Sequence, residues 1–263
     1  NDRRRPQARR EGLGGPAPQD RNQRAAASRR ERLVDLLRTR GNVAVADLPG
    51  IFGVSAETVR RDLRVLEDRH EVVRAYGSVR PAESGAFETT GEFRAAQFAE
   101  EKARIAREAC ARLGRAETVF IDEGHLPLVI GRALPTDRGL TVVTTSLPAA
   151  AELARRPGLT VVSVGGRVRP ATLGVVDRWA LSVLGSMEPD LAFIGANGVT
   201  EEGWLTTPDP SVAATKEAAI AVSHRRIFVG DHSKFDHSTF VRFARLVDFE
   251  CAITGRELPS TVA

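Results

Sequence analysis

Short apolar runs recur through the second half of the chain, and stretches of helical pattern separate most of them. The runs contain three to six residues and cover residues 118–121, 141–143, 159–164, 191–194, 227–229 and 251–254. The helical patterns cover residues 95–113, 126–134, 147–155, 174–187 and 210–224. Near-continuous apolar strands that alternate with helices predict a mostly parallel α/β sheet that is covered on both faces.

The first part of the chain has helical periodicity and ends in a strand-like pattern. Helices are predicted over residues 28–40, over residues 45–52 and from Ser55 onward, with a tight turn at Gly53 before the third. Their apolar positions recur at helical spacing, at Leu33, Leu36, Leu37, Leu48, Ile51, Phe52, Val59, Leu63 and Leu66. Residues 71–77 then fit a short strand and hairpin. Three helices followed by a hairpin predict a winged helix-turn-helix.

The third helix carries the most informative chemistry of this first part. Ser55 is placed to cap it by accepting a hydrogen bond from an amide one turn on, and the helix N-terminus adds partial positive charge. Thr58, Arg60 and Arg61 project away from the apolar stripe. A short helix with one dry face and one cationic face has the geometry to lie in a major groove. The alternative is a solvated helix whose arginines pair with neighbouring carboxylates.

Charge is distributed unevenly between the two parts. Residues 1–84 hold 18 of the 38 basic and 12 of the 34 acidic side chains, so the net positive charge of the chain is N-terminal. This asymmetry favours a basic DNA-binding part joined to a near-neutral part with another task. The expected organisation is a disordered basic tail, a DNA-binding domain, a linker and an α/β domain, at residues 1–27, 28–82, 83–94 and 95–263.

The two cysteines, Cys110 and Cys251, lie in apolar segments, and neither belongs to a Cys-x-x-Cys pair. We therefore expect two buried thiols rather than a disulfide, and neither a zinc site nor a cofactor. The chain has no signal-peptide pattern and no long apolar run. A cytoplasmic protein that does not bind membranes is therefore expected.

Polar residues follow the predicted strands, at the sheet edge where parallel α/β proteins bind ligands. They include Asp122, Gly124, His125, Thr144, Ser146, Arg167, Asp231 and Lys234. The 38 basic residues include three lysines, Lys102, Lys216 and Lys234, and the last two fall at this predicted rim. Amides at helix starts, together with Arg167, Lys216 and Lys234, favour an anionic ligand such as a phosphate.

The segment Val54–Leu63 reads Val-Ser-Ala-Glu-Thr-Val-Arg-Arg-Asp-Leu and resembles a signature of the DeoR family of bacterial transcription regulators. Residues 28–80 as a whole are similar to that family's DNA-binding domain. The resemblance implies DNA contacts from the recognition helix and the wing, at Ser55, Thr58, Arg60, Arg61, Arg64, Arg74 and Tyr76. The wing reads Arg-Ala-Tyr-Gly-Ser here, where the family usually has Arg-x-His-Gly-Gly.

Residues 97–255 resemble the sensor domain of the same family, which is similar in fold to ribose-5-phosphate isomerase. Matching segments include Asp122-x-Gly124, Gly165-Gly166-x-Val168-Arg169 and Phe193–Gly198. The resemblance implies a phosphorylated sugar or related effector held by Asp122, Gly124, Thr144, Ser146, Lys216, Asp231 and Lys234, and His125 and Arg167 are added from their rim positions. His125 and Leu126 replace two threonines of the family pattern, and Thr145 replaces an asparagine.

Three functions follow from these patterns. The first is a homo-oligomeric transcription regulator, by the family's habit a repressor of carbohydrate metabolism genes, controlled by a small anionic metabolite. The second is a regulator whose altered sensor serves only for oligomerisation. The third is a sugar-phosphate isomerase that uses a rim carboxylate as its base. We expect the first, and therefore no catalytic residues.

Overall fold

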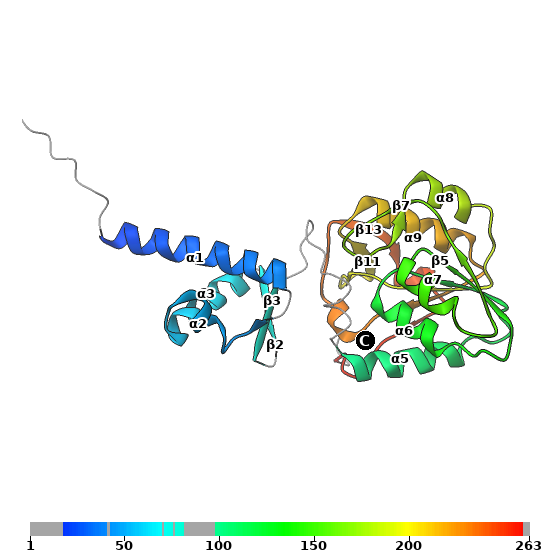
Figure 1. Cartoon of the computed structure of the whole chain (residues 1–263), viewed down its shortest axis with the longest axis horizontal. Helices are drawn as coiled ribbons and strands as arrows, with labels where there is room; N and C mark the ends of the chain where they lie inside the picture. Colours follow the sequence, from blue (N-terminus) through cyan, green and yellow to red (C-terminus); the bar gives the residue numbers. More distant parts are fainter. Residues whose placement is uncertain (1–17, 41–42, 70, 76, 82–97, 260–263) are drawn as a thin grey trace, which may run out of the picture. The chain divides into compact units, whose positions relative to one another are not determined.

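The computed structural model describes residues 18–40, 43–69, 71–75, 77–81 and 98–259. The chain divides into two compact units, Asn1–Pro81 and Ala82–Ala263 (Figure 1). No helix in the described ranges has both the length and the apolar character needed to cross a bilayer.

The N-terminal unit is a winged helix-turn-helix, as predicted. Its elements are α1 (Pro18–Arg40), β1 (Val43–Ala44), α2 (Leu48–Phe52), α3 (Ala56–Asp68), β2 (Val72–Ala75) and β3 (Ser78–Pro81). The three strands form one antiparallel sheet in the order β1-β3-β2. Leucines and valines from the helices and strands close a single core, with Leu37, Leu48 and Leu63 fully buried.

Two boundaries of this unit differ from the sequence prediction. Helix α1 begins at Pro18, so the expected disorder of residues 1–27 is wrong for residues 18–27. That segment is rich in Ala, Arg and Gln, which have high helix propensity, and a helix can continue beyond the part that packs on a core. Helix α2 begins at Leu48 rather than near residue 45, and Pro49 occupies its first turn. The expected linker at residues 83–94 lies outside the described residues.

The C-terminal unit is built on a six-stranded parallel sheet in the order β14-β12-β9-β4-β5-β6. The strands are β4 (Thr118–Ile121), β5 (Leu140–Thr144), β6 (Leu159–Ser163), β9 (Leu191–Ile194), β12 (Arg225–Val229) and β14 (Cys251–Ile253). This sheet confirms the predicted fold class. All six apolar runs of the sequence therefore became strands of one sheet.

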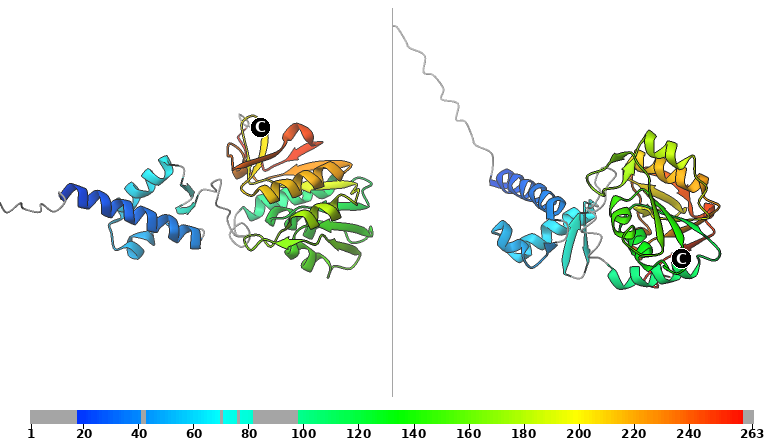
Figure 2. Two further views of the ribbon diagram at one scale, coloured as in Figure 1. Left: turned by 90° about the horizontal axis from the view of Figure 1, so that it is seen from above. Right: turned by 45° about the vertical axis from the view of Figure 1, so that its right-hand side comes forward.

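Helices cover both faces of this sheet (Figure 2). One face packs against α5 (Ala99–Ala111), α6 (His125–Ala133) and α7 (Leu147–Leu153), and the other against α8 (Arg178–Leu184) and α9 (Pro210–Val222). Alternate residues of β4 point to the two faces of the sheet. Val119 and Ile121 pack in the core beneath α5, α6 and α7, and Phe120 packs in the core beneath α8 and α9. Such two-sided burial explains why the strands read as continuous apolar runs.

Smaller elements, which the sequence pattern did not predict, surround the sheet edge. They are β7 (Arg167–Val168) paired with β8 (Val175–Val176), and an antiparallel sheet of β10 (Gly198–Val199), β11 (Trp204–Thr207) and β13 (Val241–Arg245). Two 3₁₀ turns, η1 (His232–Lys234) and η2 (Leu246–Asp248), complete the unit. These strands have only two to five residues each, too few to show a clear periodicity.

The strand order places a topological switch point between β4 and β9. The chain runs outward from β4 through β5 to β6, then returns to the other side of β4 at β9 and continues to β12 and β14. In open parallel sheets the connections diverge at such a point and leave a crevice beyond the carboxyl ends of the two strands. Asp122 follows β4 and Gly195 follows β9, so both lie at this crevice.

Candidate DNA-binding helix and effector site

The start of helix α3 is capped as the sequence predicts. The Ser55 Oγ accepts a hydrogen bond from the Thr58 amide at 3.2 Å and lies 2.9 Å from the Thr58 hydroxyl. This cap satisfies one of the free amides at the N-terminus and fixes the first turn. Ser55 therefore has a structural role in addition to any contact with DNA.

Helix α3 separates an apolar face from a cationic face. Val59, Leu63 and Leu66 are buried in the core of the unit, whereas Arg60, Arg61 and Arg64 are exposed. Arg60 lies 3.6 Å from the carboxylate of Glu57, and both side chains are more than 60 % exposed. An exposed pair of this kind stabilises a fold little. The arginine face is therefore available to a phosphate or a base edge.

The wing is tied to the end of α3 through Arg74. Its guanidinium forms a two-pronged contact with Glu67, at 2.7 Å from Nε to Oε1 and 2.5 Å from Nη2 to Oε2. The hydrogen bond that Arg74 donates to Glu67 raises the pKa of Arg74 above its ordinary value. Arg74 is therefore already engaged within the protein, and its contact with DNA stays a prediction. Tyr76, the other wing residue of the predicted set, lies outside the described residues.

Asp62 has a role that the sequence reading missed. Its carboxylate is 5 % exposed and accepts a hydrogen bond from Arg29 Nε of α1 at 2.5 Å, while Arg30 lies at 3.9 Å. Asp62 follows Arg60 and Arg61 directly in the chain. This buried ion pair therefore fixes α3 against α1 and sets the direction in which the arginine face points.

In the C-terminal unit, Asp122 lies at the centre of the switch point. Its carboxylate is 2 % exposed and accepts hydrogen bonds from the Glu123 amide at 2.8 Å, from the Gly195 amide at 2.9 Å and from Lys216 Nζ. Lys216 also donates to the Gly195 carbonyl at 3.1 Å. One buried ion pair thus joins β4, β9 and α9.

Arg169, rather than Arg167, joins the buried rim. Arg167 is exposed and lies 4.0 Å from Asp177, so the structure does not bring it together with the other predicted effector residues. Arg169 is 7 % exposed and contacts Glu123 at 3.4 Å and Asp209 at 3.1 Å. Strand β7 ends at Val168, and the contacts with Glu123 and Asp209 hold the next residue, Arg169, at the buried rim. The Gly-Gly-x-Val-Arg segment contained this signal.

The other predicted residues of the first rim loops are Gly124, His125, Thr144 and Ser146, and three of them have local structural roles. Gly124 caps α6 with a φ of 110°, which favours glycine, and His125 is the first residue of that helix. Thr144 Oγ1 accepts from the Ser146 amide at 3.0 Å, and Ser146 Oγ caps α7 by accepting from the Ala149 amide at 3.2 Å. Their hydroxyls therefore shape the loop after β5.

A second charged cluster surrounds Asp231, beyond the end of β12. The carboxylate is 4 % exposed, lies 4.0 Å from Lys102 Nζ, and accepts hydrogen bonds from the amide and hydroxyl of Ser233 at 3.1 and 2.5 Å. Burial acts to raise the pKa of Asp231, but the charge of Lys234, the Ser233 hydrogen bonds and the charge of Lys102 outweigh it, so the pKa lies below its ordinary value. Lys102 was not predicted at the rim, although its rarity as a lysine pointed there.

This electrostatic arrangement predicts a pH-dependent stability. A depressed folded pKa means that the Asp231 carboxylate stabilises the fold above its unfolded pKa of about 4, and that this contribution is lost as the pH falls through the folded pKa. Asp231→Asn is therefore expected to be less stable than the wild type at neutral pH, with the difference closing below about pH 4. Urea unfolding at several pH values measures the difference, and a gap that does not change with pH would contradict this assignment.

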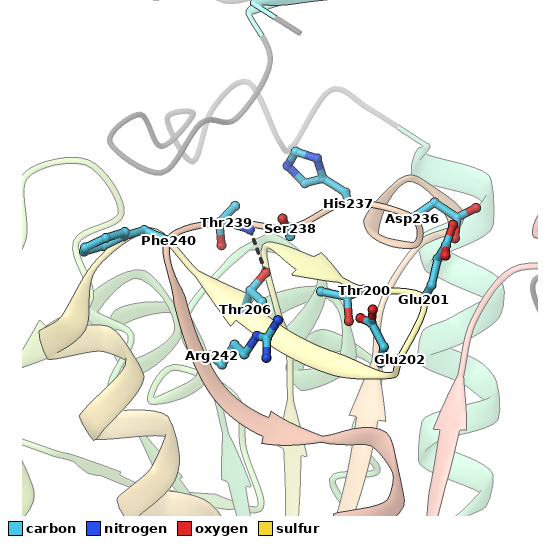
Figure 3. A pocket seen from close by; sticks show the side chains of 10 residues that line it. All are labelled: Thr200, Glu201, Glu202, Thr206, Asp236, His237, Ser238, Thr239, Phe240 and Arg242. Atoms are coloured by element: carbon cyan, nitrogen blue, oxygen red, sulfur yellow. Dashed lines mark hydrogen bonds between the residues drawn. The ribbon is translucent and has the colours of Figure 1, made fainter.

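A pocket of about 510 Å³ opens at the small antiparallel sheet (Figure 3). It is lined by Thr200, Glu201, Glu202, Thr206, Asp236, His237, Ser238, Thr239, Phe240 and Arg242. In Figure 3 the amide of Thr239 bonds to the Thr206 hydroxyl, at 3.0 Å, across its floor. None of the sequence-predicted effector residues lines it. The pocket is therefore distinct from the charged clusters around Asp122 and Asp231.

Two family models match the chain. The DeoR C-terminal sensor domain matches residues 97–256, and the DeoR-like helix-turn-helix domain matches residues 29–84. The HTH-type transcriptional regulator GlpR of Haloferax volcanii is 34 % identical over 232 residues, which cover 88 % of this chain and 91 % of that protein. The glycerol-3-phosphate regulon repressor of Escherichia coli is 29 % identical over 234 residues, which cover 89 % and 92 %.

Likeness to solved structures is weaker. The full-length sorbitol operon regulator SorC from Klebsiella pneumoniae aligns with a TM-score of 0.42 and 10 % identity, over 82 % of this chain and 92 % of that one. Ribose 5-phosphate isomerase A from Methanocaldococcus jannaschii aligns with a TM-score of 0.37 and 18 % identity, over 51 % and 53 %. Likenesses at this level carry no argument, whereas the two family models together span both units. The chain belongs to the DeoR family of transcription regulators.

Proposed function

We propose that this chain is a sequence-specific DNA-binding repressor of carbohydrate metabolism genes, and that a small phosphorylated metabolite controls its affinity for DNA. The exposed arginine face of α3 carries the proposal, because the helix is capped, anchored and free of core contacts on that side. Ser55, Thr58, Arg60, Arg61 and Arg64 are the proposed DNA-contacting residues of this helix. Related regulators are named for control of the glycerol-3-phosphate regulon, which supports the metabolic assignment.

The proposed effector site is the crevice beyond β4 and β9. Asp122, Gly124, His125, Thr144, Ser146, Lys216, Asp231 and Lys234 are retained as candidate residues from the sequence, Arg169 and Lys102 are added, and Arg167 is withdrawn. Glycerol 3-phosphate is the first compound to test, since it combines an anionic group with hydroxyls. A metabolite changes operator affinity only if it binds one arrangement of the linked units better than another.

The proposal includes a homo-oligomer and no catalysis. A symmetric operator requires at least a dimer, whose two recognition helices read equivalent half-sites. Binding to chromosomal DNA implies work in the cytoplasm. An isomerase would need a rim carboxylate as its base. Asp122 does not suit that role, because its oxygens already accept two backbone amides and Lys216.

A regulator whose sensor serves only for oligomerisation is the second candidate. The observation that favours it is the pairing of Lys216 with Asp122 and of Arg169 with Glu123 and Asp209, which leaves little net positive charge for a phosphate. A thermal-shift series with phosphorylated sugars and polyols separates the two candidates. A true effector raises the melting temperature by mass action, whereas an oligomerisation module does not respond.

Replacing Arg60 or Arg61 with alanine is expected to weaken operator binding by roughly 1–3 kcal/mol each if the side chain makes a two-pronged base contact. The operator is first identified by genome-wide mapping of bound sites, and affinity is then measured by fluorescence anisotropy at one fixed salt concentration. Arg38→Ala on α1 is the matched control, because this arginine is also exposed and pairs with Asp35. Unchanged affinity in both α3 variants would remove this helix from the groove.

A further inference from the structure

Two buried polar atoms at the switch point have no hydrogen-bond partner among the described residues. They are the hydroxyl Oγ1 of Thr145 and the amide Nδ2 of Asn197, in side chains that belong to residues only 1 % and 5 % exposed. The other end of the Asn197 amide is satisfied, because its Oδ1 accepts from the Thr207 hydroxyl at 3.1 Å. A buried polar atom without a partner costs about 1–3 kcal/mol, so folded proteins contain few of them.

The sheet register places Thr145 beside Asp122. Ile121 of β4 pairs with Thr144 of β5 in parallel, so the next residues along the two chains are Asp122 and Thr145. Phe120 and Val143 pack in the core beneath α8 and α9, and alternation of side chains directs Asp122 and Thr145 toward that same face. Lys216 of α9 reaches Asp122 there.

Asn197 closes the other side of the same crevice. It follows β9, the strand on the opposite side of β4, and its backbone N–H donates to the Thr206 carbonyl at 3.0 Å. Gly195, two residues earlier, donates to Asp122. The two atoms without partners therefore lie on the β5 side and the β9 side of the Asp122–Lys216 pair.

The nearby charges are already compensated, whereas these neutral groups are not. Lys216 faces Asp122, and Arg169 faces Glu123 and Asp209. The unused capacity is the amide NH₂ of Asn197, with its two N–H donors, and the Thr145 hydroxyl, and a hydroxyl of a ligand can both donate and accept. We propose that Thr145 and Asn197 bind the hydroxylated end of the effector, an inference that rests on the proposed function and names specificity-determining residues within it.

The test uses isosteric replacements in the full-length protein. Thr145→Val removes the hydroxyl with little change of shape, and Asn197→Leu removes the Nδ2 donor with a neutral side chain of similar shape, at the cost of the oxygen that Thr207 contacts. Each is expected to weaken binding of glycerol 3-phosphate about tenfold in calorimetric titration, which corresponds to the loss of one hydrogen bond. Glycerol and ribose 5-phosphate are titrated in parallel as further probes.

The ligand-free protein supplies a second readout. Without ligand, Thr145→Val is expected to melt at or above the wild-type temperature, because it removes a buried hydroxyl that has no partner. Thr144→Val is the matched control, since its hydroxyl accepts from the Ser146 amide, and its melting temperature is expected to fall by about 2–8 °C. A comparable fall in Thr145→Val would overturn the inference.

The outcomes separate this inference from the proposed function. If the wild type binds a probe and both isosteric variants bind it equally well, the inference is overturned while control by an effector stands. If none of the probes binds any of the proteins, both the inference and effector control fail, and DNA recognition by α3 stands alone. The inference is supported if both variants bind the probe more weakly than the wild type does and if, without ligand, Thr145→Val melts at or above the wild-type temperature while Thr144→Val melts below it.

Discussion

Replacing Lys216 with methionine is expected to destabilise the C-terminal unit by about 3–5 kcal/mol. The substitution leaves the Asp122 carboxylate 2 % exposed and without its counter-charge, and the two remaining backbone amides do not replace a cation. A loss of this size is a large share of the roughly 5–15 kcal/mol that holds a domain folded. Both tryptophans, Trp179 and Trp204, lie in this unit, so urea unfolding followed by tryptophan fluorescence reports on it selectively.

A double variant provides the control for this prediction. Lys216→Met combined with Asp122→Asn removes both charges, so it is expected to be more stable than Lys216→Met alone, because no unpaired charge stays buried. Exposed ion pairs contribute less than about 1 kcal/mol to the free energy of unfolding. If Lys216→Met lowered that free energy by no more than this, the contact between Lys216 and Asp122 would not be the buried ion pair described above.

The sequence identifies the strands of the central sheet but not their order. Each apolar run is buried on two faces and therefore carries no competing polar pattern, as in Leu191–Ile194, where all four residues are buried. The position of β9 beside β4 depends on contacts between distant segments, which periodicity does not encode. The strand β13 was missed for a related reason, since its burial does not alternate: Phe243 and Ala244 are buried in succession, between the exposed Arg242 and Arg245.

The sequence predicts which residues lie at the candidate effector site better than it predicts which side chains they contact there. Residues after parallel strands must lie at one rim, and on that basis Asp122 and Asp231 were expected there, where they come after β4 and β12 in the structure, whereas Lys216 lies within α9 and reaches Asp122 from that helix. Arg167 was chosen over Arg169 because it follows a strand-like run directly, and the turn that buries Arg169 is set by tertiary contacts with Glu123 and Asp209. Partners across the sheet cannot be inferred without the strand order.

Asp62 shows the same limit in the N-terminal unit. Helical spacing alone places this acid among arginines, which suggests a solvated network on the helix surface. In the structure its partner is Arg29, 33 residues earlier, and the pair is buried between α1 and α3. Asp62 directly follows Arg60 and Arg61 but anchors the opposite side of α3 to α1, and it therefore helps to fix the orientation of the two arginines.

Replacing Asp62 with alanine is expected to destabilise the N-terminal unit by about 3 kcal/mol, near the lower end for a broken buried pair, because Arg29 is 20 % exposed and can turn toward solvent. Amide hydrogen exchange in residues 43–69 measures this loss of stability. Tryptophan fluorescence does not report on this unit, because the unit contains no tryptophan. Operator affinity is also expected to fall, because α3 loses its anchor on α1.

The salt dependence of operator binding distinguishes this indirect effect from a lost DNA contact. Replacing an arginine that contacts a phosphate lowers the slope of log affinity against log salt concentration by about 1. Asp62→Ala removes no cation, so it is expected to leave this slope unchanged. Arg29→Lys, which keeps a positive charge beside Asp62, is the matched variant and should retain most of the wild-type affinity. Wild-type stability and affinity in Asp62→Ala would show that the Arg29–Asp62 pair does not position α3, and the arginine face would then depend on the core of the unit alone.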